Sequence, residues 1–238
     1  MSAYSGEVVQ SICFAVTKGH TMIRKTPKTR VEKREQTRRD LILATLDSIA
    51  TKGFARTTLE KVSKRAGVSR GLVNFHFESK EKLLIEALNQ MSEEYVASWR
   101  KALAGADADP LSQLVALIES DFHPRVCTRK KVAVWYGFLG EARSRHTFRG
   151  VWESRHQRFS EAMEKCCKDV AEFGNYSDID YKIVARALGA LIDSLWRDLM
   201  LSPRNFSREN SKSICFGYLA NVFPRHFDAA GALQPKKR

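Results

Sequence analysis

Apolar residues recur every three to four positions through most of the chain, a spacing that places them on one face of an α-helix. The first such stripe is Ile42, Leu46 and Ile49. It predicts a helix from about Thr37 to Lys52, which Gly53 ends. No segment alternates apolar and polar residues convincingly enough to predict a strand. The pattern therefore predicts an all-α fold.

Two short helices joined by a tight turn are predicted next. Thr57 with Glu60 three residues later is a capping-box pattern, which marks a helix start. Gly67 suits the left-handed residue after a helix, and Ser69 can cap a second helix from Arg70 to Phe75. This helix-turn-helix geometry presents a helix to a DNA groove. An αα-hairpin with a glycine turn also occurs in proteins that bind no nucleic acid, so the spacing alone leaves both interpretations open.

The remainder of the chain is predicted to be helical as well. Ser79 can cap a long helix that carries Leu84, Leu88 and Trp99 on its apolar face. The small-residue segment AGADADP follows, in which Asp109 is placed to cap the next helix and Pro110 to be its first residue. Further helices are predicted at residues 111–122, 128–144, 148–173, 180–201 and 208–222.

These elements predict four parts of the chain. Residues 1–31 lack sustained periodicity and are expected to form a basic flexible arm. Residues 32–82 form a three-helix DNA-binding head, residues 83–223 a ligand-binding and dimerisation domain, and residues 224–238 a tail. The arm either reaches along DNA, as homeodomain arms do, or is an upstream extension without a role.

Charge is unevenly distributed. The chain has a formal net charge of +13; residues 1–82 hold 17 Lys and Arg against 8 Asp and Glu, an excess of 17 − 8 = 9, and the rest holds 23 against 19. Basic residues neutralise phosphates and release counterions, so this imbalance predicts a polyanionic partner for the N-terminal part and salt-sensitive binding. A merely basic surface is the alternative, but it does not explain why the excess accompanies the helix-turn-helix pattern.

The sequence gives little support for an enzyme, a metal or redox protein, or a membrane protein. The chain lacks a P-loop, a nucleophile-elbow motif, a zinc-protease motif and any clustered set of catalytic or metal-ligating residues, which argues against an enzyme and predicts neither metal nor cofactor. The five cysteines are odd in number and show no metal or redox spacing, and no apolar run approaches the roughly 20 residues of a membrane span. We therefore expect reduced thiols and a cytoplasmic location.

The segment AGVSRGLVNFHFESKEKL resembles the signature of TetR-family transcriptional regulators. That resemblance implies that the recognition helix is the second helix of the pair. The family frequently has Tyr at the position of Asn74, and Tyr or Trp at that of Phe75. We expect DNA contacts from this helix and its surroundings, and from the basic start of the first helix. The expected DNA-binding residues are Arg38, Arg39, Thr57, Ser69, Arg70, Gly71, Asn74, Phe75, His76 and Lys80.

Aromatic residues gather in the C-terminal part. Trp135 and Phe138 share a helix face, as do Asp193 and Trp196. Two aromatic walls with a carboxylate between them would suit an organic cation. Aromatic residues at helical spacing are more often plain core, and that alternative stays open.

The segment ALGALIDSLWRDLMLSP, with VWYGF earlier, resembles BetI-type repressors of the glycine betaine pathway. This resemblance implies a homodimeric repressor that binds a palindromic operator and responds to choline or betaine aldehyde. The alternatives are a TetR-type regulator of an unrelated small molecule and a basic architectural DNA-binding protein without ligand. The ligand-binding residues expected are Trp135, Phe138, Trp152, Asp193 and Trp196. The family pairs its last two helices across the dimer, which here would use Val184, Leu188, Leu191, Leu195, Leu199, Cys215, Tyr218, Leu219 and Val222.

Overall fold

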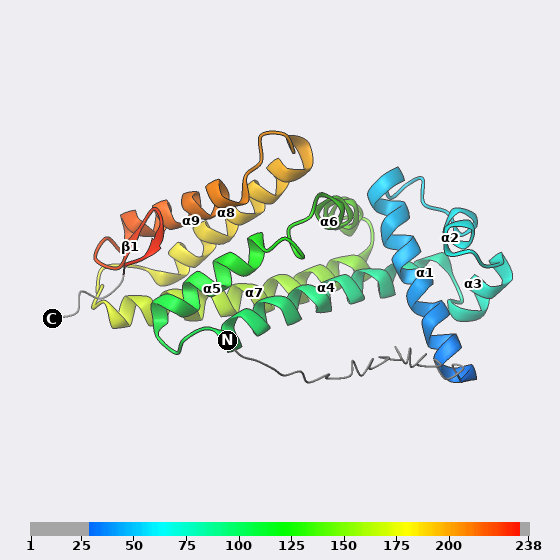
Figure 1. The fold of residues 1–238 in the computed structure, drawn as a ribbon, viewed down its shortest axis with the longest axis horizontal. Coiled ribbons are helices and arrows are strands. Elements are labelled where there is room, and N and C mark those ends of the chain that lie inside the picture. The colour runs from blue at the N-terminus through cyan, green and yellow to red at the C-terminus, as the bar shows by residue number, and fades with distance from the viewer. Residues whose placement is uncertain (1–28, 234–238) are drawn as a thin grey trace, which may run out of the picture.

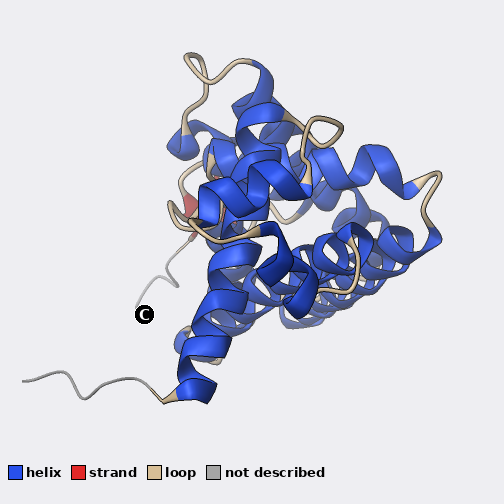
Figure 2. Cartoon of the chain, turned by 90° about the vertical axis from the view of Figure 1, so that its right-hand side faces the viewer, coloured by secondary structure: helices blue, strands red, loops and turns tan. Residues whose placement is uncertain are grey.

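The computed structural model describes residues 29–233 of the chain, and within them the fold is almost entirely helical (Figures 1 and 2). The predicted arm up to residue 28 and the last five residues lie outside the described part. The elements are α1 (Arg30–Lys52), α2 (Leu59–Ala66), α3 (Arg70–His76), α4 (Lys80–Gly105), α5 (Pro110–Phe122), α6 (Arg129–Ala142), α7 (His146–Phe173), α8 (Tyr181–Leu201), α9 (Arg208–Val222), β1 (Phe227–Asp228) and β2 (Gly231–Ala232).

Helices α1 to α3 form a small head at one end of an elongated molecule, and α4 to α9 form the body (Figure 1). Helix α1 begins seven residues earlier than predicted. Thr29 accepts a hydrogen bond from the backbone of Glu32, and the Glu32 carboxylate accepts one in return, which is a capping box that the periodicity did not reveal. Gly53 ends α1 as expected, at φ 84°.

The turn between α2 and α3 forms as the sequence predicts, with one correction. Thr58, not Thr57, caps α2, since its hydroxyl accepts from the backbone N–H of Lys61. Gly67 adopts the left-handed conformation at φ 69°, and the next residue closes the turn through a backbone hydrogen bond of 3.0 Å to Ser63. Ser69 caps α3 by accepting from the backbone N–H of Leu72 at 3.2 Å.

Two hydrophobic clusters hold the fold. One lies in the head and includes the first half of α4; the other fills the body between α4, α5, α7, α8 and α9. Helices α4 and α7 run side by side along the long axis (Figure 1). Phe54 of the head, Phe138 of α6 and Phe148 of α7 pack edge to face at 5.3 to 5.8 Å between ring centroids. These three rings join the head to the body.

The end of the chain differs from the predicted tail. Residues 227–228 and 231–232 pair as a short antiparallel hairpin, and Phe227 is buried against α9. The sequence offered too few residues there for a strand pattern, because each strand has two. The described helices include none that is long and apolar enough to cross a membrane.

The last two helices use their apolar residues differently from the prediction. The proposed dimer residues Val184, Leu188, Leu195, Leu199, Cys215 and Leu219 are buried in the body of the same chain. Helical spacing shows which apolar residues share a face of α8 or α9. It does not show whether that face packs against the same chain or against a second copy. The large apolar residues of α8 and α9 that remain exposed are Ile183, Leu201 and Ile214.

Candidate functional site

Helix α3 is anchored by one side chain and exposes the others. Val73 is fully buried in the head core, whereas Arg70, Gly71, Asn74 and Phe75 are exposed. Phe75 exposes 66% of its surface, which is unusual for a large aromatic residue on a seven-residue helix. The helix therefore offers one arginine, one amide and one ring to a partner.

A cationic environment surrounds the end of α3. The Arg34 guanidinium lies 5.4 Å from the centre of the Phe75 ring, and Arg38 lies at the same distance from the Phe77 ring. Burial lowers the pKa of His76, and the nearby Arg34 and Arg38 lower it further while Glu35 opposes them. A neutral His76 can still donate a hydrogen bond to a phosphate.

The other expected DNA-binding residues occupy distinct settings. Thr57 is buried, and its hydroxyl donates to the carbonyl of Gly53 at 3.0 Å, so the structure gives it a role inside the head instead of at the surface. Arg38 forms an ion pair with Glu86 of α4. Arg39 is exposed, and Lys80 is half-buried at the start of α4 with no ion pair to any residue in the described range.

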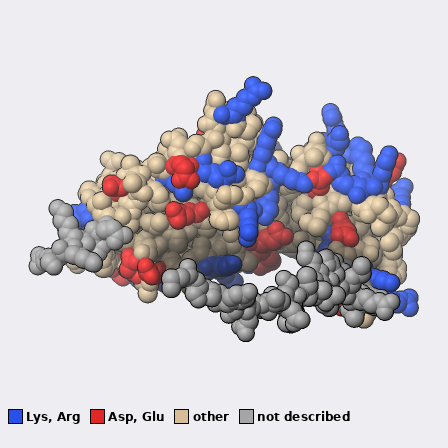
Figure 3. All heavy atoms as spheres, in the orientation of Figure 1, with Lys and Arg blue, Asp and Glu red and all other residues tan. Residues whose placement is uncertain are grey.

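Lysine and arginine side chains gather over the half of the surface that includes the head, whereas the far end of the body shows few on the same face (Figure 3). Part of this charge is neutralised internally, since Asp47 of α1 pairs with both Arg65 of α2 and Lys130 of α6. The exposed remainder on α1 and α3 gives the head its positive surface.

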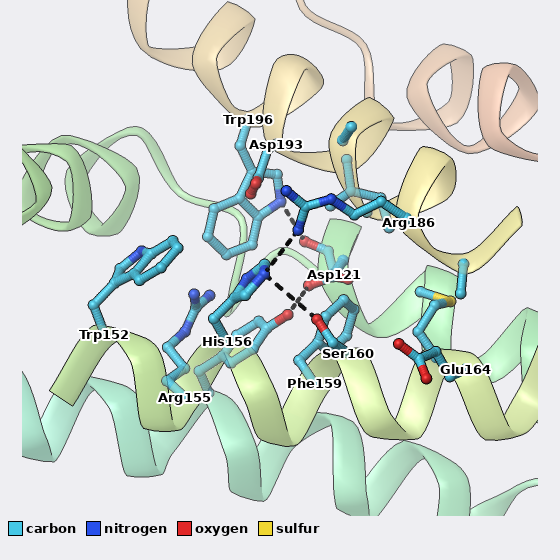
Figure 4. Close-up of a pocket in the computed structure, with 16 residues that line it drawn as sticks. Asp121, Trp152, Arg155, His156, Phe159, Ser160, Glu164, Arg186, Asp193 and Trp196 are labelled. Carbon is cyan, nitrogen blue, oxygen red and sulfur yellow. Dashed lines mark hydrogen bonds between the residues drawn. The ribbon is translucent and has the colours of Figure 1, made fainter. Parts of the chain in front are cut away.

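A cavity of about 220 Å³ lies in the body among α4, α5, α7 and α8 (Figure 4). Pockets for drug-sized ligands usually have about 300–1,000 Å³, so this cavity suits a smaller molecule. Asp193 and Arg186 of α8 are exposed and lie at its rim, and the Trp152 and His156 rings of α7 stack at 4.8 Å along its wall. Arg186 also lies 3.3 Å from His156 Nε2.

Arg155 occupies the aromatic box that borders this cavity. Its guanidinium carbon lies 3.8 Å from the ring centres of both Tyr95 and Trp135, and 5.9 Å from that of Trp196. The side chain is 8% exposed. Burial lowers the pKa of Arg155, but an arginine remains charged at pH 7. A permanent cation of the chain itself therefore lies where the sequence predicted a cation from outside.

Asp121 of α5 supplies a buried carboxylate to the lining of the same cavity. Its Oδ1 accepts a hydrogen bond of 2.6 Å from the Tyr95 hydroxyl, and its backbone carbonyl accepts from the Trp196 indole at 3.2 Å. Its Oδ2 is buried and has no partner among the described residues. Burial raises the pKa of Asp121 to about 7, against the lowering effects of Tyr95 and Arg155.

The structure brings four of the five predicted ligand-binding residues to this region. Trp152, Asp193 and Trp196 line the cavity, and Trp135 lies behind the Arg155 guanidinium, where it lines only a smaller cavity of about 30 Å³. Phe138 is the exception, because it packs between Phe54 and Phe148 in the head cluster. Helical spacing placed it beside Trp135, but a three-residue step also moves a side chain along the helix axis toward the next layer.

Sequence reasoning predicted Asp193 but missed Asp121 and Arg155, the two buried charged residues of the cavity. Asp121 sits on the apolar stripe of the predicted 111–122 helix, which is a signal that could have been used. Arg155 gives no such signal, because the aromatic rings that enclose it come from three other helices. The described residues hold no group of His, Cys, Asp and Glu suited to a metal ion.

Comparison with known proteins agrees with this architecture. Residues 41–87 match the model of bacterial regulatory proteins of the tetR family, and residues 110–224 match that of the BetI-type transcriptional repressor C-terminal domain. The HTH-type transcriptional regulator BetI of Stenotrophomonas maltophilia is 29% identical over 195 residues, which cover 81% of this chain and 95% of the relative.

Solved structures give the same fold. A transcriptional regulator from Pseudomonas aeruginosa PAO1 superposes with a TM-score of 0.72 at 27% identity, covering 80% of this chain and 91% of that one. A regulator from Saccharomonospora viridis in complex with choline superposes with a TM-score of 0.70 at 22% identity, covering 81% and 97%. With its helix-turn-helix head and helical body, the chain belongs to the TetR family of transcriptional regulators, and its C-terminal part is of the BetI repressor type.

Proposed function

We propose that this protein is a ligand-responsive repressor that binds a palindromic operator as a homodimer and releases it when a small molecule enters the body cavity. The observation that carries the DNA-binding half is the exposed face of α3, where Arg70, Asn74 and Phe75 stand on a helix fixed by buried Val73. Arginine and asparagine are suited to guanine and adenine edges in the major groove. Lys80, His76 and Arg39 are the proposed phosphate contacts.

Dimerisation is proposed through the outward faces of α8 and α9. Ile183 and Leu201 each expose 67% of their surface and Ile214 exposes 40%, which leaves apolar area that a monomer would keep in water. Ala187 and Ala190 continue the Ile183 face of α8, and a methyl group added at Gly217 of α9 would meet no atom within 4 Å. A two-fold dimer places two heads on the two half-sites of a symmetric operator.

Choline and betaine aldehyde are the first effectors to test. The support is the BetI-type family match, the choline-bound relative and a cavity that combines Tyr95 and Trp196 with the carboxylates of Asp121 and Asp193. Aromatic faces and carboxylates together attract organic cations.

The connection between cavity and head is proposed to be mechanical. Helix α7 carries Arg155 at the cavity and Phe148 in the head cluster. Helix α6 carries Trp135, which contacts the Arg155 guanidinium, and Phe138 in the head cluster. A ligand that binds one arrangement of these helices better than the other shifts the population toward it. Because the aromatic rings of the head cluster are close-packed, a shift of α6 or α7 moves the head as a unit and changes the spacing of the two recognition helices.

The test is a fluorescence-anisotropy titration of the full chain with its own promoter and with unrelated DNA. We expect a preference for the promoter of about a thousandfold or more, which an architectural DNA-binding protein would not show. Lys80→Ala should weaken binding to both DNAs and reduce the slope of log affinity against log salt by about 0.9.

Lys101→Ala is the matched control, because Lys101 is an exposed lysine on the same helix at its far end. It should change neither affinity nor slope. Equal binding to promoter and unrelated DNA would reject the repressor. A salt slope that Lys80→Ala leaves unchanged would reject the phosphate contact alone.

A further inference from the structure

The aromatic box beside the cavity is already filled by the chain. The Arg155 guanidinium lies between the Tyr95 and Trp135 rings, and Arg155 lines both the main cavity and the small cavity that contains Trp135. Trp135 does not line the main cavity. An incoming cation would therefore reach the full box only by displacing Arg155, and it would meet a positive charge on the way.

The guanidinium has aromatic contacts but no direct ion pair with a carboxylate. Although it is nine-tenths buried, it forms no hydrogen bond or ion pair with any residue in the range 29–233. Stacking on two rings stabilises a buried cation only in part, and its five N–H donors still require acceptors. A carboxylate is the group that matches the planar guanidinium, because two parallel hydrogen bonds can form.

A purely anionic ligand does not fit the rest of the cavity. Asp121 presents a buried Oδ2 without a partner, and Asp193 and Glu164 also line the cavity. Figure 4 shows Arg155 on one side of His156 and Asp121 on the other. Positive and negative groups thus line the same small volume, and no hydrogen bond or ion pair joins Arg155 to Asp121.

We propose that the effector of this protein is a small zwitterion, whose carboxylate pairs with Arg155 and whose ammonium group lies against Asp121 and Asp193. This inference rests on the proposed regulatory function and defines the class of its ligand. One molecule then gives a partner both to the Arg155 guanidinium and to the unpartnered Oδ2 of Asp121, and the volume of about 220 Å³ limits that molecule to a compact one.

Four ligands of nearly equal shape test this class by isothermal titration calorimetry on the full chain. Glycine betaine carries both charges, choline carries only the cation, 3,3-dimethylbutyrate only the carboxylate, and 3,3-dimethyl-1-butanol neither. We expect glycine betaine to bind at least about tenfold more tightly than choline and than 3,3-dimethylbutyrate, since each loses one charge-assisted pair. Choline binding as tightly as glycine betaine, or no binding of glycine betaine, would overturn the proposal.

Variants then assign the carboxylate preference to Arg155. Arg155→Met should reduce the ratio of the glycine betaine and choline affinities to about one, because the box opens and the anion loses its partner. Arg158→Met is the control, since Arg158 lies on the same helix but pairs with Glu93 outside the cavity, and it should keep the wild-type ratio. Arg155→Lys retains the charge and should keep part of the preference. A wild-type ratio in Arg155→Met would contradict the assignment.

The outcome is separable from that of the regulatory proposal. Operator affinity without ligand is measured on the same preparations, and its absence would reject DNA regulation whatever the calorimetry gives. If the protein binds its operator and choline releases it, but glycine betaine binds no more tightly than choline, the regulatory proposal stands and the zwitterion proposal is rejected.

Discussion

At Asp121, burial and hydrogen bonding act in opposite directions on one carboxyl group. Burial raises its pKa to about 7, although the Tyr95 hydroxyl and the Arg155 guanidinium both favour the charged form. Asp193, His156, Arg186 and Glu164 also face the cavity. At neutral pH the group is therefore divided between its protonated and charged states, which makes it sensitive to small changes in its surroundings.

This raised pKa predicts how stability depends on pH. The folded state holds the Asp121 proton more tightly than the unfolded chain, so the group's contribution is largest below pH 4 and is lost as pH rises through about 7. Asp121→Asn removes this dependence while keeping an oxygen for the Tyr95 hydroxyl. Between pH 5 and pH 8, urea unfolding should show the wild type losing roughly 2 kcal/mol relative to the Asn variant.

Asp198→Asn is the control for this measurement, because Asp198 is an exposed carboxylate on α8. Its difference from wild type should stay constant over the same pH range. A constant difference for Asp121→Asn as well would contradict the raised pKa.

At the scale of elements, the turn between α2 and α3 depends on one backbone conformation. Gly67 lies at φ 69°, where a Cβ atom strains the backbone even though no neighbouring atom would contact it. Gly67→Ala should therefore destabilise the protein by about 1 kcal/mol, measured by chemical unfolding.

Gly150→Ala is the matched control, and we expect it to raise the free energy of unfolding instead of lowering it. Gly150 lies inside α7, has an ordinary helical backbone and has open space around its Cα, so alanine should stabilise the protein by about 0.5–1 kcal/mol. A Gly67→Ala protein as stable as wild type would contradict the left-handed turn.

Elements were predictable where their signals are local. The caps Ser69, Ser79 and Asp109 accept hydrogen bonds from residues two or three positions later, and the sequence identified all three. The helix predicted at 208–222 has the observed bounds. The first helix was predicted too short, because residues 30–36 contain only one apolar residue, the exposed Val31, and a single residue shows no periodicity.

At the scale of the whole molecule, the exposed apolar face of α8 and α9 predicts self-association. Ile183→Glu combined with Ile214→Glu places two charges on that face, and both side chains are exposed in the single chain, so folding should be retained. We expect light scattering to show a dimer for the wild type and mainly monomer for the double variant, with operator affinity reduced at least about tenfold.

Leu43→Glu is the control, since Leu43 is exposed by 53% on α1, away from α8 and α9. It should remain dimeric. A dimeric double variant would show that the chains associate through another surface.

The sequence by itself determined the helical class, the helix-turn-helix with its capped helices, and the family, because these depend on contacts within a few residues along the chain. Only the tertiary structure decided which faces of α8 and α9 turn inward, that Phe138 joins the head instead of the cavity, and that Arg155 fills the aromatic box. The physical reason is that helical periodicity fixes which residues share a face, whereas the partner of each face depends on how distant segments pack.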